Sequence, residues 1–126
     1  MIEVVAAMIR DGDRVLLCRR PEGKAQGGKW EFPGGKIEPG ETGPEALARE
    51  CREELDVTLA VGEALADVQQ DYPGRSIHLT LYEARVASGN PRKLEHSEIR
   101  WVRPEEIAGY DLCPADARLI ERMRGN

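Results

Sequence analysis

The amino-acid sequence predicts a mixed α/β (α+β) fold, because short strand-like segments are interleaved with two amphipathic helix-like segments. Apolar residues make up 40% of the 126 residues, and this share can supply a core for one domain over residues 1–126. Charged residues make up 33% of the chain and aromatic residues only 5%, which is typical of a soluble globular protein.

The first third of the chain predicts three strands. Residues 1–9 and 14–18 are apolar and β-branched, and the turn signal Asp11-Gly12-Asp13 between them predicts a β-hairpin. Residues 21–29 are rich in glycine and charge, which indicates a loop. Residues 30–32 predict a short third strand.

Residues 44–55 predict the clearest helix. Thr42 and Glu45 fit a capping box at its start, in which each side chain bonds the other residue's backbone N–H group. Apolar residues recur at four-residue spacing and predict a buried stripe: Leu47, Cys51 and Leu55.

The rest of the chain predicts further strands and a closing helix. Residues 57–61 and 64–69 read as two extended stretches, and apolar and polar residues alternate over 76–86 as in a half-buried strand. Residues 99–102 predict another short strand, and residues 114–123 a final amphipathic helix.

Charge and composition exclude several classes of partner. The net charge of −5 argues against polymeric nucleic acid, whereas a divalent metal would allow a single nucleotide to bind. The apolar run at residues 4–9 is too short to span a bilayer, and no secretory signal is recognisable. Three cysteines without a CxxC pair and two histidines predict neither a disulfide framework nor a zinc cage. We therefore expect a cytoplasmic monomer or weak homodimer without a membrane partner.

Three carboxylates share one face of the 44–55 helix, beside its apolar stripe. At about 100° per residue, Glu54 lies about 40° to one side of Glu50 and Glu53 about 60° to the other. The like-charged pair Glu50 and Glu54 destabilises an isolated helix by a few tenths of a kcal/mol, and anions near a helix C-terminus cost about 0.3–1 kcal/mol each. A positive partner is therefore expected.

Two kinds of partner fit these acids. Arg49 and Arg52 would give an ordinary salt-bridged surface helix. A divalent cation is the alternative, since hard ions such as Mg²⁺ take several oxygen ligands. The paired Gly34-Gly35 favours the cation, because glycines at a strand end let the backbone approach an ion closely, and Glu41 adds a fourth acid before the helix.

Residues 35–57 resemble the Nudix box, G-x5-E-x7-R-E-U-x-E-E-x-G-U, where U is aliphatic. The glycine, the four glutamates, the arginine and the last aliphatic position match: Gly35, Glu41, Arg49, Glu50, Glu53, Glu54 and Val57. Cys51 replaces an aliphatic residue, and Asp56 replaces the closing glycine. Because that glycine position favours left-handed backbone, which Asp adopts at some cost, the departure concerns the helix exit and removes no ligand.

The resemblance extends over nearly the whole chain. Further segments are similar to MutT-like enzymes of the Nudix hydrolase family, and especially to the branch called CTP pyrophosphohydrolase: residues 1–9, 19–21, 30–36, 74–79 and 112–116. The resemblance implies an α/β/α sandwich around a mixed β-sheet, which agrees with the order of the predicted elements.

The resemblance also implies a Mg²⁺-dependent enzyme, with Mn²⁺ as a substitute, that hydrolyses a nucleoside triphosphate to the monophosphate and diphosphate. The implied metal ligands are a glycine carbonyl and several acids: Gly34 or Gly35, Glu50, Glu53, Glu54 and Glu98. Such a metal offsets phosphate charge and lowers the pKa of bound water. Arg49 would orient the neighbouring glutamates, Glu41 would support the loop–helix junction, and either Glu53 or Glu98 would remove the proton.

Substrate-binding positions follow from the same resemblance: Arg20, Phe32, Lys36, Tyr72, Arg75 and Asp116. The arginines suit phosphate oxygens, and the two aromatic rings would wall the base. An ionised Asp116 only accepts hydrogen bonds and favours an amine such as cytosine N4, whereas a protonated Asp116 also donates and keeps 8-oxoguanine open. The leading substrates are 8-oxo-dGTP and (5-methyl-)(d)CTP.

Other functions fit the sequence less well. Enzymes of this family that hydrolyse ADP-ribose or dinucleoside polyphosphates usually carry additional sequence around the box. A non-catalytic nucleotide-binding Nudix domain would lack box glutamates, and none is lost here. A P-loop is excluded because Ile37, rather than Ser or Thr, follows Gly34-Gly35-Lys36. A GxSxG motif, which a serine hydrolase would need, is absent.

Overall fold

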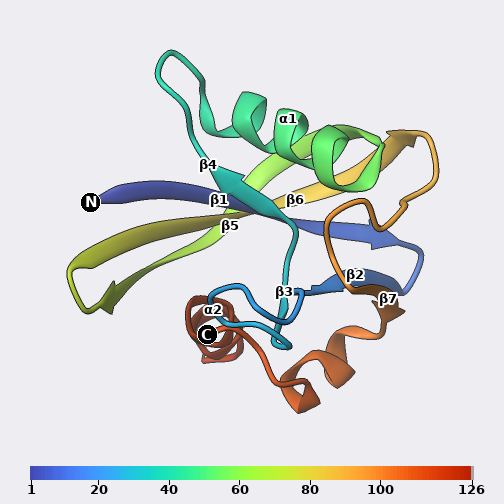
Figure 1. Cartoon of the computed structure of the whole chain (residues 1–126). Coiled ribbons are helices and arrows are strands. Elements are labelled where there is room, and N and C mark those ends of the chain that lie inside the picture. Colours follow the sequence, from blue (N-terminus) through green and yellow to red (C-terminus); the bar gives the residue numbers. More distant parts are fainter. Residues whose placement is uncertain (126) are drawn as a thin grey trace.

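The computed structural model describes residues 1–125, and it confirms the mixed α/β fold (Figure 1). Its strands are β1 (Ile2–Asp11), β2 (Arg14–Arg19), β3 (Trp30–Glu31), β4 (Gly34–Lys36), β5 (Thr58–Tyr72), β6 (Arg75–Ser88) and β7 (Glu98–Val102). Its helices are α1 (Gly43–Leu55), α2 (Pro114–Arg124) and a 3₁₀-helix, η1 (Pro104–Gly109).

The strands form one mixed sheet in the order β3-β2-β1-β6-β5, with β4 added to β1 and β7 added to β2. Strands β1 and β6 run parallel over eight residue pairs, and the other pairings are antiparallel. Because β1 pairs with three other strands, it is central to the sheet and is buried on both faces from Val5 to Ile9.

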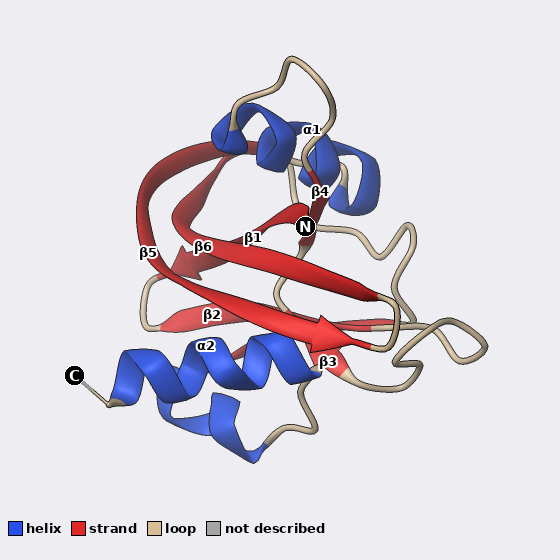
Figure 2. Cartoon of the chain, turned by 90° about the vertical axis from the view of Figure 1, so that its left-hand side faces the viewer, coloured by secondary structure: helices blue, strands red, loops and turns tan. Residues whose placement is uncertain are grey.

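Helices cover the sheet on opposite sides, α1 on one and α2 on the other (Figure 2). Alternate residues of β1 serve the two layers. Val5, Ala7 and Ile9 pack in the core that contains the apolar stripe of α1. Ala6 and Met8 pack in the second core, which contains residues of α2 and η1. This arrangement agrees with the α/β/α sandwich that the family resemblance implied.

The predicted hairpin of the first two strands forms only at its turn end. Strands β1 and β2 pair at Arg10–Val15 and Asp11–Arg14 and then diverge, since β1 continues beside β6 and β2 continues beside β7. The extended stretches predicted over 57–61 and 64–69 are one strand, β5, whose register shifts near Gly62 where it holds extra residues opposite β6.

The capping box predicted at the start of α1 is present. Thr42 Oγ1 accepts the Glu45 backbone N–H at 3.2 Å, and the Thr42 N–H donates to Glu45 Oε1 at 2.9 Å. At the other end, Asp56 adopts the left-handed conformation (φ 57°, ψ 43°) of the glycine that it replaces. Its N–H bonds Arg52 O at 3.1 Å, and its carboxylate accepts a bond from Arg92 at 3.1 Å. The helix exit therefore keeps its geometry without glycine.

Among the described residues, no helix is both long and apolar enough to cross a membrane.

Candidate active site

The position of α1 against β4 depends on two glycines. A Cβ atom at Gly34 would lie 2.0 Å from the carbonyl oxygen of Val5, so no other residue fits beside β1 there. A Cβ atom at Gly35 would lie 2.4 Å from the carboxyl carbon of Glu50. The Glu50 carboxylate thus lies directly on the β4 backbone, as expected for a site that combines box acids with a glycine carbonyl.

Arg49 joins the acids on both sides of the loop that leads into α1. Its Nε and Nη2 donate to the two oxygens of Glu41 at 2.7 and 3.0 Å. Its Nη1 donates to Glu50 at 2.9 Å and to Glu53 at 2.8 Å. Nη2 also bonds the carbonyl oxygen of Lys36 at 3.1 Å, while the Lys36 side chain is exposed. The Arg49 hydrogen bonds lower the pKa of Glu41 to about 2, so Glu41 stays ionised.

Glu54 is a half-buried carboxyl that forms no ion pair with another of the described residues. Its Oε1 is buried and makes no hydrogen bond within residues 1–125. Burial, and after it the neighbouring Glu50 carboxylate, raises the pKa of Glu54 to about 9. A buried, unbonded carboxylate oxygen beside a second carboxylate fits a divalent cation, which would supply the missing ligand bond and the missing charge. The donor set of α1 is all oxygen, as Mg²⁺ prefers.

Glu98 lies apart from these acids. Ile99 and Trp101 of β7 face the core under α1, so Glu98 and Arg100, at alternate positions, face the other side of the strand. There the Glu98 carboxylate accepts a bond from Arg100, whose guanidinium lies 5.1 Å from the Trp30 ring centroid.

Glu95 is the later acid that the chain places beside Glu54. The backbone N–H of Leu94 bonds the carbonyl of Glu54 at 3.2 Å, and the N–H of Arg92 bonds that of Leu55 at 2.9 Å. This loop therefore follows the C-terminus of α1, and Glu95 and Glu54 line the same small hollow. The sequence contains both Glu95 and Glu98 in this region. Only the position of β7 in the structure shows that the two side chains face different parts of the molecule.

Most of the predicted substrate-binding residues line one cavity of about 200 Å³. Its lining includes three of the predicted metal ligands, Glu54, Gly34 and Gly35, and the predicted substrate-binding residues except Lys36: Arg20, Phe32, Tyr72, Arg75 and Asp116. Apolar residues of β1 and β6 complete the wall: Val4, Ala6, Ile77 and Leu79. A cavity with apolar walls and a few polar groups is typical of a small-molecule site.

The two aromatic residues differ in setting. Phe32 is only 3% exposed and packs in the core beneath α2. Tyr72, at the end of β5, is half-buried, and the Arg75 guanidinium lies 5.4 Å from its ring centroid. Phe32 therefore gives the cavity a fixed wall, and Tyr72 with Arg75 gives it a rim.

Asp116 lies in the wall of the cavity. It is 5% exposed, and its Oδ1 accepts the backbone N–H of Phe32 at 3.0 Å. Burial, and after it the Glu31 carboxylate, raises the pKa of Asp116 to about 8. The Asp116 carboxyl therefore keeps its proton at neutral pH while the cavity is empty.

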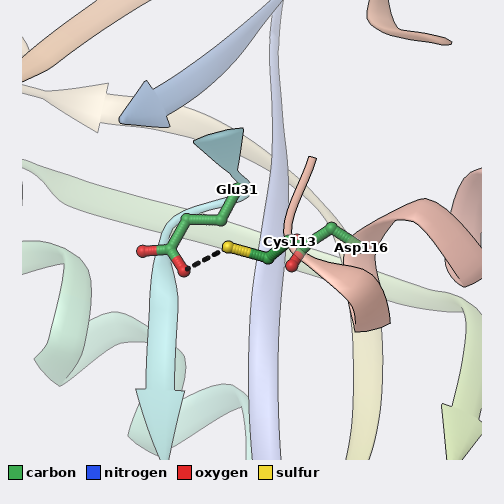
Figure 3. Close-up of side chains that lie close together, drawn as sticks. All are labelled: Glu31, Cys113 and Asp116. Atoms are coloured by element: carbon green, nitrogen blue, oxygen red, sulfur yellow. Dashed lines mark hydrogen bonds between the residues drawn. The ribbon is translucent and has the colours of Figure 1, made fainter. Parts of the chain in front are cut away.

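Glu31 and Cys113 lie beside Asp116, and the sequence did not single them out (Figure 3). One oxygen of each acid and the Cys113 Sγ lie within 4.8 Å of one another. Glu31 accepts a bond from Arg20 Nη1 at 3.2 Å, and its other oxygen lies 3.1 Å from His96 Nε2. Glu31 lies between two core residues, Trp30 and Phe32. A charged residue between two buried apolar ones was the sequence signal that could have pointed to it.

Comparisons with known proteins agree with this arrangement. A family model described as NUDIX domain matches residues 4–122. The chain is 46% identical over 121 residues to the CTP pyrophosphohydrolase of Escherichia coli (strain K12), covering 96% of the chain and 90% of the relative. It is 34% identical over 124 residues to the 8-oxo-dGTP diphosphatase of Haemophilus influenzae, covering 98% and 91%.

Among solved structures, that of a MutT protein from Methanosarcina mazei Go1 is similar, with a TM-score of 0.86 at 31% identity over 98% of this chain and 93% of that one. The family model and both relatives span nearly the whole chain, and Glu54 of the box lines the same cavity as Gly34 and Gly35. The chain belongs to the Nudix family of hydrolases.

Proposed function

We propose that this protein is a Mg²⁺-dependent nucleoside triphosphate pyrophosphohydrolase that converts a triphosphate and water into the monophosphate and diphosphate. The observation that carries the proposal is one cavity that is lined both by Asp116 and by Glu54 and Gly35. A nucleotide whose base lies against Asp116 would extend its phosphates toward the acids of α1. Relatives with this activity in their names match nearly the whole chain.

At the phosphate end, Glu50, Glu53 and Glu54 would hold the metal together with a carbonyl of Gly34 or Gly35. When bound, Mg²⁺ supplies positive charge for the triphosphate and lowers the pKa of its bound water, and Mn²⁺ is the expected substitute. Arg49 fixes Glu50 and Glu53 by direct hydrogen bonds, so these carboxylates are oriented before the substrate arrives.

Proton removal from the attacking water is assigned to Glu53. Its side chain is 55% exposed, so it is open to water, and one of its oxygens is fixed by Arg49. Glu95 replaces Glu98 as the later acid that assists at this end, because Glu95 lies beside Glu54 whereas Glu98 bonds Arg100. Lys36 is assigned to the phosphates of the substrate, and Arg75 to the rim of the cavity. The positive charge of each side chain would offset the negative charge of the substrate.

At the base end, Asp116 and Glu31 form a donor–acceptor pair. Asp116 Oδ1 accepts the Phe32 N–H, so the proton on this carboxyl resides on the other oxygen and is available to a base. Glu31 accepts bonds from Arg20 and His96 and offers its oxygen beside Cys113 as an acceptor. The pair therefore matches a base edge that places an acceptor next to an N–H donor.

Two of the leading substrates present such an edge. Cytosine places the N3 acceptor beside the N4 amine, and 8-oxoguanine places the O6 acceptor beside N7–H. Thymine reverses the order found in cytosine, because its ring N3–H donates where cytosine N3 accepts and its O4 accepts where cytosine N4 donates. Recognition of (5-methyl-)(d)CTP and 8-oxo-dGTP by one site follows from this shared pattern, and the enzyme would remove modified nucleotides from the precursor pool.

The state of the cysteines and the net charge support the proposed location and partner of the protein. Its three cysteines are free and buried, which supports a cytoplasmic location, where thiols stay reduced. The acidic net charge supports a nucleotide rather than a nucleic-acid polymer as its partner.

The test of the proposed function is product analysis with dCTP, 8-oxo-dGTP and dTTP in the presence of Mg²⁺. We expect one diphosphate for each monophosphate formed, a higher kcat/KM for the first two substrates, and loss of turnover when a chelator removes the metal. Release of inorganic phosphate alone would assign another bond, and turnover that survives the chelator would exclude the metal.

A further inference from the structure

We propose that His96 is a positioning residue for base recognition, which fixes the Glu31 carboxylate as an acceptor although His96 does not line the nucleotide cavity. The inference deepens the proposed function and rests on it for the identity of the ligand, a nucleotide whose base presents an acceptor beside an N–H donor. His96 precedes β7 and lines the small hollow on the other side of Glu31.

Glu31 needs an anchor because its carboxylate must keep one orientation among side chains whose pKa values its charge raises. Asp116, Cys113 and Glu54 all lie near enough to Glu31 for its charge to raise their pKa values or to add to their rise. A glutamate side chain without a support has three rotatable bonds and would adopt several orientations. It would then no longer face Asp116 across the cavity.

Besides the Cys113 thiol, whose Sγ lies 4.0 Å from Glu31 Oε1, Arg20 and His96 hold Glu31 in place, and these two differ in rigidity. Arg20 Nη1 donates to it at 3.2 Å, but the Arg20 Nε is bonded to the carbonyl of Ala25 in the loop between β2 and β3. His96 Nε2 lies 3.1 Å from the other oxygen, and the His96 side chain is only 5% exposed. The imidazole is therefore the buried, rigid support of the two.

The hydrogen-bond inventory of His96 points to the same role. A carboxylate has no proton to donate, so Nε2 carries the hydrogen in the contact with Glu31. Nδ1 is buried and makes no hydrogen bond within residues 1–125. The bond to Glu31 is thus the polar contact that determines the orientation of the ring.

The backbone around His96 is fixed at both ends. The N–H of Leu94 bonds the carbonyl of Glu54, at the end of α1. The N–H and the hydroxyl of Ser97 both donate to the carbonyl of Arg19 at the end of β2, at 3.0 and 3.3 Å. His96 is therefore held between the metal-site helix and the sheet, and a support fixed in this way can keep an acceptor within the narrow range that base discrimination requires.

The test compares the affinities of dCMP and dTMP, measured by calorimetry on wild type and variants, so that no turnover is needed. We expect wild type to prefer dCMP, and His96→Ala to reduce the preference about tenfold, as for loss of one hydrogen bond to a charged group. His96→Gln should restore most of it, because the Gln amide places a donor near the position of Nε2. His96→Asn is shorter and should not. His78→Ala is the matched control, since it removes the chain's other histidine, whose ring contacts Glu3 and Asp67 and does not line the cavity, and it should leave the preference unchanged.

Kinetics give a second measurement. With dCTP, His96→Ala should raise KM and leave kcat within about twofold, since the groups at the phosphate end are untouched. An unchanged dCMP preference in His96→Ala, an equal loss of affinity for both nucleotides, or a failure of His96→Gln to differ from His96→Ala would each overturn the proposal. If His96→Ala does not fold, the contrast between His96→Gln and His96→Asn decides.

The two proposals fail separately. A wild-type protein that binds dCMP over dTMP through His96 but releases no diphosphate from dCTP would contradict the proposed function alone. A wild-type protein that releases diphosphate but shows no preference for dCMP would contradict the role of His96 alone.

Discussion

Replacement of Glu53 by Gln should lower kcat about 10³-fold while the protein stays folded. The substitution removes a negative charge from the metal site and removes the acid assigned to accept the proton. The fold does not depend on it, because the Glu53 side chain is 55% exposed and a Gln oxygen can still accept the bond from Arg49. Steady-state kinetics with dCTP and circular dichroism of the variant measure the two effects.

Glu45→Gln is the matched control on the same helix. Glu45 accepts the backbone N–H of Thr42 in the capping box, and Gln serves equally well in that position. Its kcat should stay within about twofold of wild type. A kcat for Glu53→Gln that is as close to wild type as that of the control would remove Glu53 from the reaction.

Asp116→Asn should keep the preference for cytosine over thymine, and that preference should no longer fall at alkaline pH. Asp116→Ala should lose the preference. In wild type, Asp116 has a pKa of about 8, so ionisation above that pH removes its donor, and the kcat/KM for dCTP relative to dTTP should fall. The Asn amide donates at every pH, and its oxygen can still accept the Phe32 N–H.

The raised pKa of Asp116 also predicts how the free energy of unfolding changes with pH. The pKa of Asp116 is higher in the folded protein, about 8, than its ordinary value of 3.8, so the fold favours the protonated carboxyl. Its contribution to stability is complete below about pH 4 and declines as the pH rises toward about 8. The free energy of unfolding of Asp116→Asn relative to wild type should therefore increase over that window.

Asp111→Asn is the control for both measurements, because the Asp111 side chain is 74% exposed and its ion pair with Lys29 lies at the surface. A cytosine preference that falls at the same pH in Asp116→Asn and in wild type would assign the titration to another group. The role of Asp116 as a protonated donor would then be excluded.

The parts of the site that lie on one helix could be predicted from the sequence. Glu50, Glu53 and Glu54 share a face because helical geometry fixes their angles, and the capping box sets where that helix begins. The left-handed backbone of Asp56 could also be predicted, because it follows from the position of Asp56 directly after the last helical turn.

The parts that depend on pairing between distant segments could not. Asp116 accepts a hydrogen bond from the backbone of Phe32, which lies 84 positions away in the sequence. A local sequence pattern cannot predict a contact between residues so far apart. The direction of Glu98 depends on which face β7 presents when it pairs with β2, so Glu95 and Glu98 could not be told apart. Glu31 belongs to the cavity only because His96 and Cys113 are brought to it by the fold.

The most direct measurement is the anomalous diffraction of a crystal soaked in Mn²⁺. We expect a peak bounded by the carboxylates of Glu50, Glu53 and Glu54 and by the carbonyl of Gly34 or Gly35. The Glu31, Cys113 and Asp116 group contains a thiol and should stay without the ion. A peak confined to that second group, or no peak at α1, would contradict a metal held by the acids of the box.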